Sequence, residues 1–383
     1  MYINLHTIFT MAGANPNRDD AGAPKTLVYG GKERARISSQ SMTRAKRVAY
    51  ESDPDGELSY RSTKIAEEVV NRIKKLATRD GVSINEEQEK KIRSEAVKAI
   101  TSLTAGDEKS NKKSKGKEEG ETTNTKDDEG SPKDTLVWLA EKEINDAAEK
   151  IFNKFNKNEE ATVKPEDFVN AEGKTDSLAI AAFGRMYAQR PDLQNEAAIQ
   201  RSDAFTTHAA EIDIDFFTTV DDLTTSQGAG HLGNKMNTSG VYYWHANIDT
   251  NQLLKTWQID PSSAEGKARL KALLLSLLTA LPSGGENTHA HHGLPQFVMA
   301  VPSKRPVSLQ SAFEKPVKQD REGGYVESSV TSLISEHNKA SDFYPSLFAE
   351  RAIGASPSKF EVEGYDSLAN IEELVSRIVA WIK

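Results

Sequence analysis

The stretch GVYYWHANI at residues 240–248 decides the fold, because a run of aromatic and β-branched residues is typical of a buried strand. Three stretches of similar character lie far from it in the chain: YINLHTIFT at 2–10, SLAIAAF at 177–183 and QFVMAV at 296–301. The sequence therefore predicts four strands, which we expect to form one small sheet.

Helical patterns surround these strands. The segment KARLKALLLSLLTAL at 267–281 predicts a strong helix, and Pro282 with a following pair of glycines marks its end. A second helix is expected after Gly31, and SLANIEELVSRIVAWIK at 367–383 predicts a third at the end of the chain. Strands and helices in this arrangement predict an α+β fold.

Residues 61–160 form a predicted helical insertion. Apolar residues recur there at helical spacing, in the groups Ile65, Val69, Ile73 and Leu76, then Ile92, Ala96 and Leu103, then Leu136, Leu139, Ile151 and Phe155. Between the last two groups, residues 106–134 contain no aliphatic or aromatic side chain. Such a segment buries too little to offset its ordering entropy, so we expect a disordered loop.

The composition excludes several classes of protein. With no cysteine among 383 residues, the chain has no disulfide, thiolate zinc site or cysteine nucleophile. The start, MYINLHTIFTMAG, has no basic leader, and the longest apolar run, at 272–281, is too short to span a membrane. We expect a cytoplasmic protein that does not contact a membrane.

Charge is unevenly distributed along the chain. The net charge is −8, yet the first fifty residues carry eight basic and three acidic residues, or +5, which leaves −13 for the rest. An acidic protein does not attract nucleic acid over its whole surface. Any binding of a polyanion must therefore be local.

The segment GGKERARISSQSMTRAKR at 30–47 is the predicted site of such binding. Gly30 and Gly31 allow a ligand to approach the main chain, and a helix that begins at Ser38 or Ser39 offers free amides to an anion. Nearby hydroxyls and cations complete a phosphate-binding pattern: Ser38, Ser39, Ser41, Lys32, Arg34 and Arg36. Since the three cations alternate, an extended backbone would point them one way.

Within the predicted helix, Arg44 and Arg47 lie three residues apart, opposite an apolar face of Met42, Ala45 and Ala49. They form either a phosphate-binding ridge or a solvated face that pairs with distant carboxylates. Upstream, Arg18 in NRDD at 17–20 is either another phosphate contact or the ion-pair partner of a neighbouring aspartate.

Two further patterns suggest enzymes. GAGHLG at 228–233 satisfies the GxGxxG spacing of dinucleotide-binding proteins, but no strand leads into it and no helix follows. We interpret it as the tip of a hairpin that joins DIDFFTTV to GVYYWHANI. Along that hairpin, Glu211, Asp213 and Asp215 alternate with apolar residues, as a solvated strand face or a Mg²⁺ site would require.

The triplet His289, His291 and His292 allows three interpretations: metal ligands or a general base, an RNA contact, or a plain surface loop. The common signatures of hydrolases and nucleoside triphosphatases, G-x-S-x-G, HExxH and Walker A, do not occur in the sequence.

Several motifs together resemble the CasC family, the backbone subunit of the type I-E CRISPR Cascade complex. NRDD, GGKERARISSQSMTRAKR, DIDFFTTVDDL, GAGHLG, TSGVYYWHANI and AFEKPV follow one another here in that family's order. The resemblance covers residues 1–50 and 177–320.

The resemblance implies a modified RNA-recognition fold of the ferredoxin-like type. On this view the palm comprises residues 1–60, 175–204 and 240–383, a helical finger insertion covers 61–174, and a long β-hairpin thumb covers 205–239. The implied partners are guide RNA, target DNA in the assembled complex, further copies of the chain and other Cascade subunits. It implies no cofactor and no metal.

The resemblance also implies site residues. RNA contacts are expected at Arg18, Lys25, Lys32, Arg36, Ser38, Gln40, Arg44, Arg47 and Met186, in addition to the residues predicted above from the phosphate pattern. Phe217 and Leu232 are expected in the thumb. Because a guide sequence varies, such a subunit must hold the backbone of the RNA and leave the bases free.

The leading hypothesis is therefore a non-catalytic subunit that oligomerises along guide RNA and presents its bases to target DNA in antiviral defence. A metal-dependent RNA endonuclease that uses Asp213, Asp215 or the histidine triplet is the alternative. A purely structural assembly subunit that never touches RNA is a third hypothesis.

Overall fold

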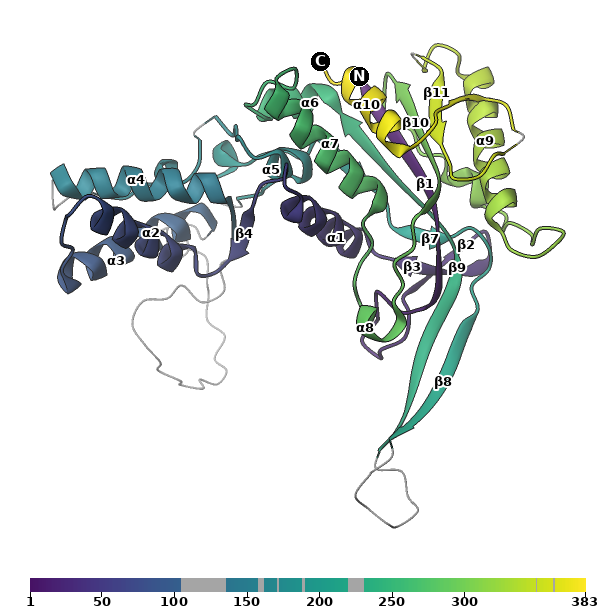
Figure 1. Ribbon diagram of the computed structural model, residues 1–383, viewed down its shortest axis with the longest axis horizontal. Coiled ribbons are helices and arrows are strands. Elements are labelled where there is room, and N and C mark those ends of the chain that lie inside the picture. Colours follow the sequence, from purple (N-terminus) through teal and green to yellow (C-terminus); the bar gives the residue numbers. More distant parts are fainter. Residues whose placement is uncertain are drawn as a thin grey trace, which may run out of the picture. The chain divides into compact units, whose positions relative to one another are not determined.

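The computed structural model describes residues 1–104, 136–157, 162–170, 172–187, 190–219, 231–348, 350–360 and 362–383 (Figure 1). The chain divides into two compact units. The sheet unit contains residues 1–56, 198–251 and 260–383, and the helical unit contains 57–197 and 252–259. The predicted disordered loop at 106–134 lies outside the described residues.

The sheet unit is built on a ten-stranded sheet with the order β12-β11-β10-β1-β9-β7-β3-β2, while β6 and β8 pair with β9 off this path. All pairs are antiparallel except β11 with β12. The strands are β1 (Tyr2–Ala14), β2 (Thr26–Tyr29), β3 (Lys32–Ile37), β6 (Ile199–Arg201), β7 (Ala204–Thr206), β8 (Ile212–Thr219), β9 (His231–Asp249), β10 (Pro295–Ser303), β11 (Ala352–Ala355) and β12 (Tyr365–Ser367). Three of the four predicted strands are thus confirmed.

Strand β9 is the longest and has two different halves. Residues 240–249 pair with β1 in the middle of the sheet, where Tyr242, Tyr243 and Trp244 are buried. Residues 231–238 continue in the same strand and pair with β8 as a hairpin that projects from the sheet (Figure 1). The predicted hairpin is confirmed, although His231, Leu232 and Gly233 belong to its strand and not to its tip.

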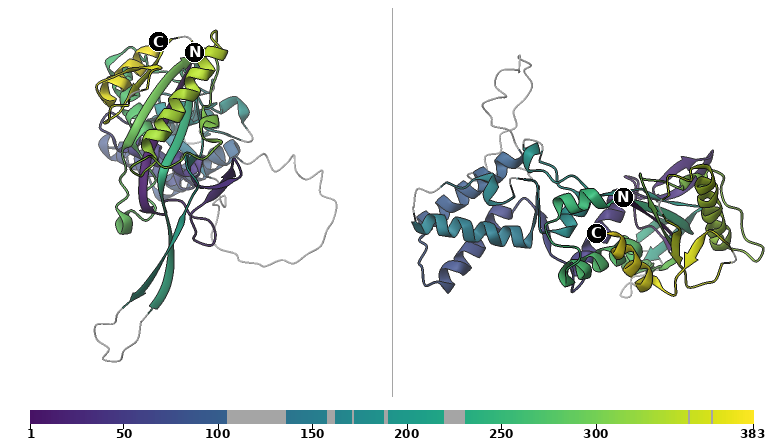
Figure 2. Two further views of the ribbon diagram at one scale, coloured as in Figure 1. Left: turned by 90° about the vertical axis from the view of Figure 1, so that its right-hand side faces the viewer. Right: turned by 90° about the horizontal axis from the view of Figure 1, so that it is seen from above.

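Helices cover both faces of the sheet (Figure 2). On one face α9 (Val326–Phe343) packs its buried residues Val330, Leu333 and Ile334 against Tyr243 and Met299. On the other face lie α1 (Ser39–Ser52), α7 (Ala264–Thr279) and α10 (Ile371–Trp381). The predicted helices at 267–281 and 367–383 are confirmed, and the sheet between helical layers confirms the α+β class.

The helical unit has a core of its own. It contains α2 (Ile65–Arg79), α3 (Glu86–Thr104) and α4 (Glu141–Lys157), together with a small sheet of β4 (Ser59–Ser62) and β5 (Val137–Ala140). Shorter elements complete the described chain: η2 (Pro165–Asp167), α5 (Leu178–Phe183), η3 (Pro191–Leu193), α6 (Thr250–Thr256), α8 (Glu286–His289) and η4 (Gln310–Phe313). None of the helices in the described ranges is long and apolar enough to cross a membrane.

Two predicted elements are of the wrong type. SLAIAAF is the helix α5 and not a strand: Ser177 caps its start by accepting the N–H of Ile180, and Gly184 ends it with a φ of +78°. A short run buried on all sides has no periodicity to distinguish helix from strand. Likewise Leu139 lies in strand β5, and the helix α4 begins only at Glu141.

Three histidines are buried where α9 covers the sheet. His6 on β1 stacks beside His245 on β9 at 6.1 Å between ring centroids, and His337 on α9 lies close enough to affect the charge of His6. His6 Nδ1 lies 2.9 Å from the Tyr243 hydroxyl. Burial lowers the pKa of all three imidazoles, to about 4 for His245 and His337.

This cluster predicts acid sensitivity. The imidazoles stay neutral in the folded chain but take up protons near pH 6.5 once unfolded, so stability is complete above about pH 6.5 and is lost as the pH falls toward 4. Urea denaturation at pH 7, 6 and 5 should show a loss that begins below about pH 6.5 and approaches about 1.4 kcal/mol per pH unit for each of His245 and His337. The variant His245→Asn should lose less stability on acidification than the parent chain, because one buried imidazole is removed. A stability that is flat from pH 7 to pH 5 would contradict this prediction.

Candidate nucleic-acid interface

The helix α1 begins where the sequence predicts. Ser38 is the N-cap, and its hydroxyl accepts the N–H of Ser41 at 3.3 Å. The N–H of Ser38 donates to Asn17 Oδ1 at 2.9 Å, which ties the start of the helix to the loop that carries Arg18. Ser38 therefore both caps the start of α1 and links it to the preceding loop.

A carboxylate of the chain itself occupies the N-terminus of α1. Asp203 Oδ1 accepts the N–H of Ser39 at 2.6 Å, and its Oδ2 pairs with the guanidinium of Arg36 at 3.0 Å. The prediction that the amides of this helix start are free is therefore wrong for Ser38, Ser39 and Ser41. Asp203 takes both the N–H of Ser39 and the guanidinium of Arg36.

Arg34 is a structural residue. Its side chain is 0% exposed, and its guanidinium donates to the carbonyls of Thr206, Thr207 and Phe313 at 2.8–2.9 Å. The prediction that Arg34 contacts RNA is wrong, because these carbonyls enclose its charge. The residue instead fastens the segment at 313–314 to β3.

Gly30 also has a structural role. Together with Gly31 it forms the turn between β2 and β3, with φ of +58° and +71°. A Cβ on Gly30 would lie 1.7 Å from the carbonyl oxygen of Glu314. The close approach predicted for a ligand is thus made by the chain itself at Gly30, while the space beside Gly31 is open.

Lys46 is a further cation that the fold uses internally, and sequence reasoning missed it. Its ammonium lies 4.1 Å from the centre of the Trp244 ring and donates to the carbonyls of Leu277 and Ala280, at the C-terminal end of α7. Burial lowers its pKa to about 7. The inward face of α1 is Met42, Lys46 and Tyr50, so the predicted face of Met42, Ala45 and Ala49 holds only for Met42.

Besides the paired Arg36 and Arg47, four cations of the region reach solvent: Arg18, Lys32 and Arg44 are exposed, and Lys25 is half-buried. Within the described part of the chain, no ion pair joins any of these four to a carboxylate. We call them the unpaired cations. Arg47, by contrast, pairs with Glu51 at 2.7 Å, and only 15% of its side chain is exposed.

Hydrogen bonds hold the loop that bears Arg18 and Lys25 against the basic segment. The N–H of Lys25 donates to the Asn17 carbonyl at 3.1 Å, and the N–H of Arg36 donates to the Lys25 carbonyl at 2.7 Å. Asp19 is satisfied by the N–H groups of Ala21 and Ala23, so the carboxylate shapes the loop. The fold therefore joins two motifs that lie apart in the sequence.

The base of the hairpin β8–β9 meets this loop. Asn15 Nδ2 donates to the carbonyls of Gly22 and Met236 at 3.0 and 2.9 Å. Farther out, Leu232 is exposed, and Phe217 lies over Gly233 with the Lys235 ammonium 5.1 Å from its ring. The predicted thumb residues thus lie on the hairpin whose base adjoins the loop of Arg18 and Lys25.

Met186 belongs to the helical unit and is 81% exposed. Its neighbours are buried: Arg185 pairs with Glu143 at 2.6 Å, and the ring of Tyr187 packs in the core. A large apolar side chain is thus presented to solvent from a firmly held backbone.

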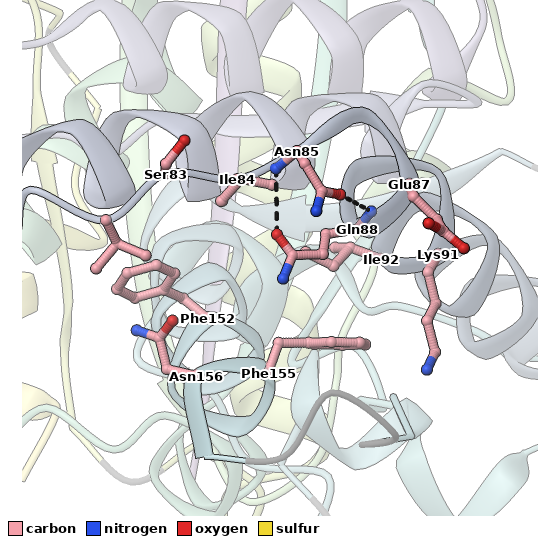
Figure 3. A pocket seen from close by; sticks show the side chains of 11 residues that line it. Ser83, Ile84, Asn85, Glu87, Gln88, Lys91, Ile92, Phe152, Phe155 and Asn156 are labelled. Atoms are coloured by element: carbon pink, nitrogen blue, oxygen red, sulfur yellow. Dashed lines mark hydrogen bonds between the residues drawn. The ribbon is translucent and has the colours of Figure 1, made fainter.

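A pocket of about 220 Å³ also lies in the helical unit, over Phe152 and Ile92 (Figure 3). Its amides serve the fold, because Asn85 and Gln88 each accept the other's backbone N–H and so cap the start of α3. None of the predicted RNA contacts lines it.

The residues of the alternative endonuclease are dispersed. In the described ranges, no group of three His, Asp or Glu side chains is arranged to hold a metal ion. On β8, Asp213 and Asp215 lie opposite Asn237 and Lys235 of β9. His291 is buried with Nε2 at 3.0 Å from the Pro282 carbonyl, and His292 lies 3.4 Å from Glu286.

Comparison with known structures defines the class of fold. One chain, from a "CRISPR RNA-guided surveillance complex, pre-nicking", is 24% identical with a TM-score of 0.76. A second, from a "CRISPR RNA-guided surveillance complex", is 22% identical with a TM-score of 0.67, and each match covers 100% of both chains. The fold is thus one found in such complexes.

The family follows from the sequence. Residues 3–377 match the model of the family described as CT1975-like protein, and the chain belongs to that family. A search of the curated proteins finds no match.

The role of Arg34 can be tested by stability. Replacing it with methionine leaves three buried carbonyls without their charged donor, so the free energy of unfolding should fall by about 3 kcal/mol. The matched change Arg44→Met, at an exposed cation, should shift it by no more than about 0.5 kcal/mol. Urea denaturation of both variants measures the difference, and equal stabilities would contradict the structural role.

Proposed function

We propose that this chain is a non-catalytic RNA-binding backbone subunit of a Cascade-type CRISPR complex, of type I-E. Copies oligomerise along guide RNA, bind its phosphate backbone and present its bases to target DNA in antiviral defence. The observation that carries the proposal is the set of unpaired cations, two of which lie on the loop that meets the base of a projecting hairpin, in a chain whose fold occurs in RNA-guided surveillance complexes.

The chemistry of the unpaired cations favours a phosphate backbone over bases. Arg18, Lys25, Lys32 and Arg44 offer positive charge, and a cation not already paired can neutralise a phosphate without breaking an ion pair. Such contacts do not depend on base sequence, as a subunit that accepts any guide requires. Ser38, Ser39, Gln40 and Arg47 are proposed as further contacts, and Met186 as a wedge against bases.

We assign the palm of a modified RNA-recognition fold to residues 1–60, 175–204 and 240–383, the finger to 61–174 and the thumb to 205–239. Support comes from the hairpin β8–β9 at the proposed thumb and from the separate core of the proposed finger.

The direct test is the purified chain. RNA should co-purify with it and raise the ratio of absorbance at 260 nm to that at 280 nm. Removal of this RNA by nuclease should break up the oligomers. A protein that carries no RNA, or whose oligomers survive nuclease treatment, would contradict the proposal.

Salt dependence tests the cations themselves. Arg18→Ala, Lys32→Ala and Arg44→Ala should each weaken binding of single-stranded RNA and reduce the slope of log affinity against log salt by about 0.7. The loss should be equal for RNAs of unrelated sequence. Lys271→Ala removes another exposed cation, on α7, and should change neither quantity. A variant that combines Arg18→Ala, Lys32→Ala and Arg44→Ala and keeps the parent salt slope would refute the phosphate contacts of these cations.

Asp203 should limit binding at the same surface. The isosteric change Asp203→Asn removes the negative charge from the N-terminus of α1 and releases Arg36 from its ion pair. We expect RNA to bind more tightly by about 1 kcal/mol, or roughly fivefold. Asp260→Asn alters another carboxylate that accepts a backbone N–H, from Ser262, and is the control. Unchanged or weaker binding in Asp203→Asn would contradict this role.

A further inference from the structure

Lys46 on α1 is a buried cation whose ammonium has three acceptors. It is 2% exposed, and its Nζ donates to the carbonyls of Leu277 at 2.5 Å and Ala280 at 3.1 Å. The face of the Trp244 ring is the third acceptor, since its centre lies 4.1 Å from Nζ. Three acceptors match the three N–H groups of an ammonium. A neutral amine has two N–H groups and a lone pair, so loss of the proton must weaken at least one of these contacts.

The two carbonyls belong to the C-terminal end of α7, which lies beside α1 on one face of the sheet (Figure 1). The last carbonyls of a helix have no N–H partner within it, and together they carry partial negative charge. An ammonium satisfies these carbonyls and also neutralises the charge of the helix end, whereas an amine does only the first. The charge state of Lys46 therefore decides how firmly α1 is joined to the end of α7.

The end of α7 also meets the loop that precedes β2. Shortly after the helix, Gly284 packs so closely that a Cβ on it would lie 2.4 Å from the Pro16 carbonyl oxygen. The next residue of the loop, Asn17, accepts the N–H of Ser38 at the start of α1. The loop, α1 and the end of α7 therefore form a closed ring of contacts, in which Lys46 links the two helices.

Three of the four unpaired cations lie on this ring. Arg18 and Lys25 belong to the loop, and Arg44 is exposed on α1 two residues before Lys46. Phosphates repeat at a fixed interval along a nucleic acid, so cations that bind them together must keep their spacing. A looser contact between α1 and α7 would alter the spacing between Arg44 and the loop.

Ionisable side chains around Lys46 are few. Among the described residues they come from α1, from the sheet and from the segment after α7: Tyr50, Arg47 with its partner Glu51, Tyr242 and His291. Residues 272–281 at the end of α7 have no ionisable side chain. The buried histidines His6 and His245 lie under α9, on the other face of the sheet. Burial is the cause that lowers the pKa of Lys46, to about 7.

The folded chain accommodates both charge states of Lys46. An unfolded lysine holds its proton until about pH 10.4, so above pH 7 the unfolded chain binds more protons than the folded one. The stability of the chain therefore rises with pH between about 7 and 10, although Lys46 loses its charge. A loss of RNA binding over this range cannot come from unfolding.

From these observations we infer that Lys46 is a positioning residue of the RNA site. Its ammonium holds α1 against the end of α7 and so keeps Arg18 and Arg44 at the spacing that a phosphate backbone requires, and RNA binds less tightly once the ammonium loses its proton. RNA in turn favours the ammonium, because coupling between two binding equilibria is reciprocal. The inference rests on the proposed function, since it names a residue that positions the proposed phosphate contacts.

The pH profile of RNA binding tests this role. The probe is a short single-stranded oligoadenylate without a terminal phosphate, because none of its groups titrates between pH 6 and pH 8.5. Over this range the affinity of the parent chain should fall by about fivefold, with a midpoint near pH 7, while urea denaturation shows a stability that rises. Lys46→Met has no charge to lose, so it should bind weakly throughout the range and show no step. The matched change Lys271→Met, at an exposed lysine of α7, should keep the parent profile.

Lysine labelled with ¹³C at Cε reports the proton directly by nuclear magnetic resonance. One resonance should titrate near pH 7, be absent from Lys46→Met, and titrate at higher pH when RNA is bound. Its midpoint should coincide with that of the affinity profile of the parent chain, a comparison that needs no variant.

Circular dichroism and melting temperature show whether Lys46→Met is folded. The inference is overturned if the parent chain binds equally at pH 6 and pH 8.5, or if the two midpoints differ. A folded Lys46→Met that keeps the step, or that binds as tightly as the parent chain does at pH 6, overturns it as well. A parent chain that binds no oligoadenylate even at pH 6 contradicts the proposed function instead.

Discussion

The continuity of β9 is the constraint on which the rest of the sheet unit depends. Residues 231–238 of this strand form half of an exposed hairpin, and residues 240–249 of the same strand pair with β1 in the core. The junction is tight: a Cβ on Gly240 would lie 2.8 Å from His208 Nε2, which accepts the N–H of Val241 at 3.1 Å. His208 in turn stacks on Tyr325 at 3.9 Å. Because pairing with β1 fixes the register of the buried half, it also fixes which side chains the exposed half presents.

Most cations of the basic segment have partners within the fold. Arg34 and Lys46 are buried, and each donates hydrogen bonds to carbonyls from distant parts of the chain. Arg36 and Arg47 are held by carboxylates. Fewer cations are therefore available to a ligand than the sequence indicates. Backbone hydrogen bonds join β3 of the basic segment to the loop that carries Arg18 and Lys25. A local positive surface on an acidic protein favours a bound polyanion at that place alone.

The sequence predicts the elements that have a strong local pattern. It does not predict features that depend on contacts with residues far away in the chain. The buried strands, the start of α1 and the hairpin follow from local composition. The buried apolar run SLAIAAF has no periodicity to show that it is a helix. The helix α9 is not among the predicted elements. Its apolar spacing would have indicated a helix, because Val326, Val330, Leu333 and His337 recur at helical intervals. No local pattern could show that Arg34 is enclosed, since its partners lie 172 to 280 residues away.

The fold, and not a bound base, holds the unpaired cations in place. Arg18 and Lys25 lie on a loop that backbone hydrogen bonds tie to β3, near the base of the hairpin. Phosphates are evenly spaced along a nucleic acid whatever its bases are. Contacts whose positions are set by an antiparallel sheet therefore do not depend on base sequence, as the proposed function requires.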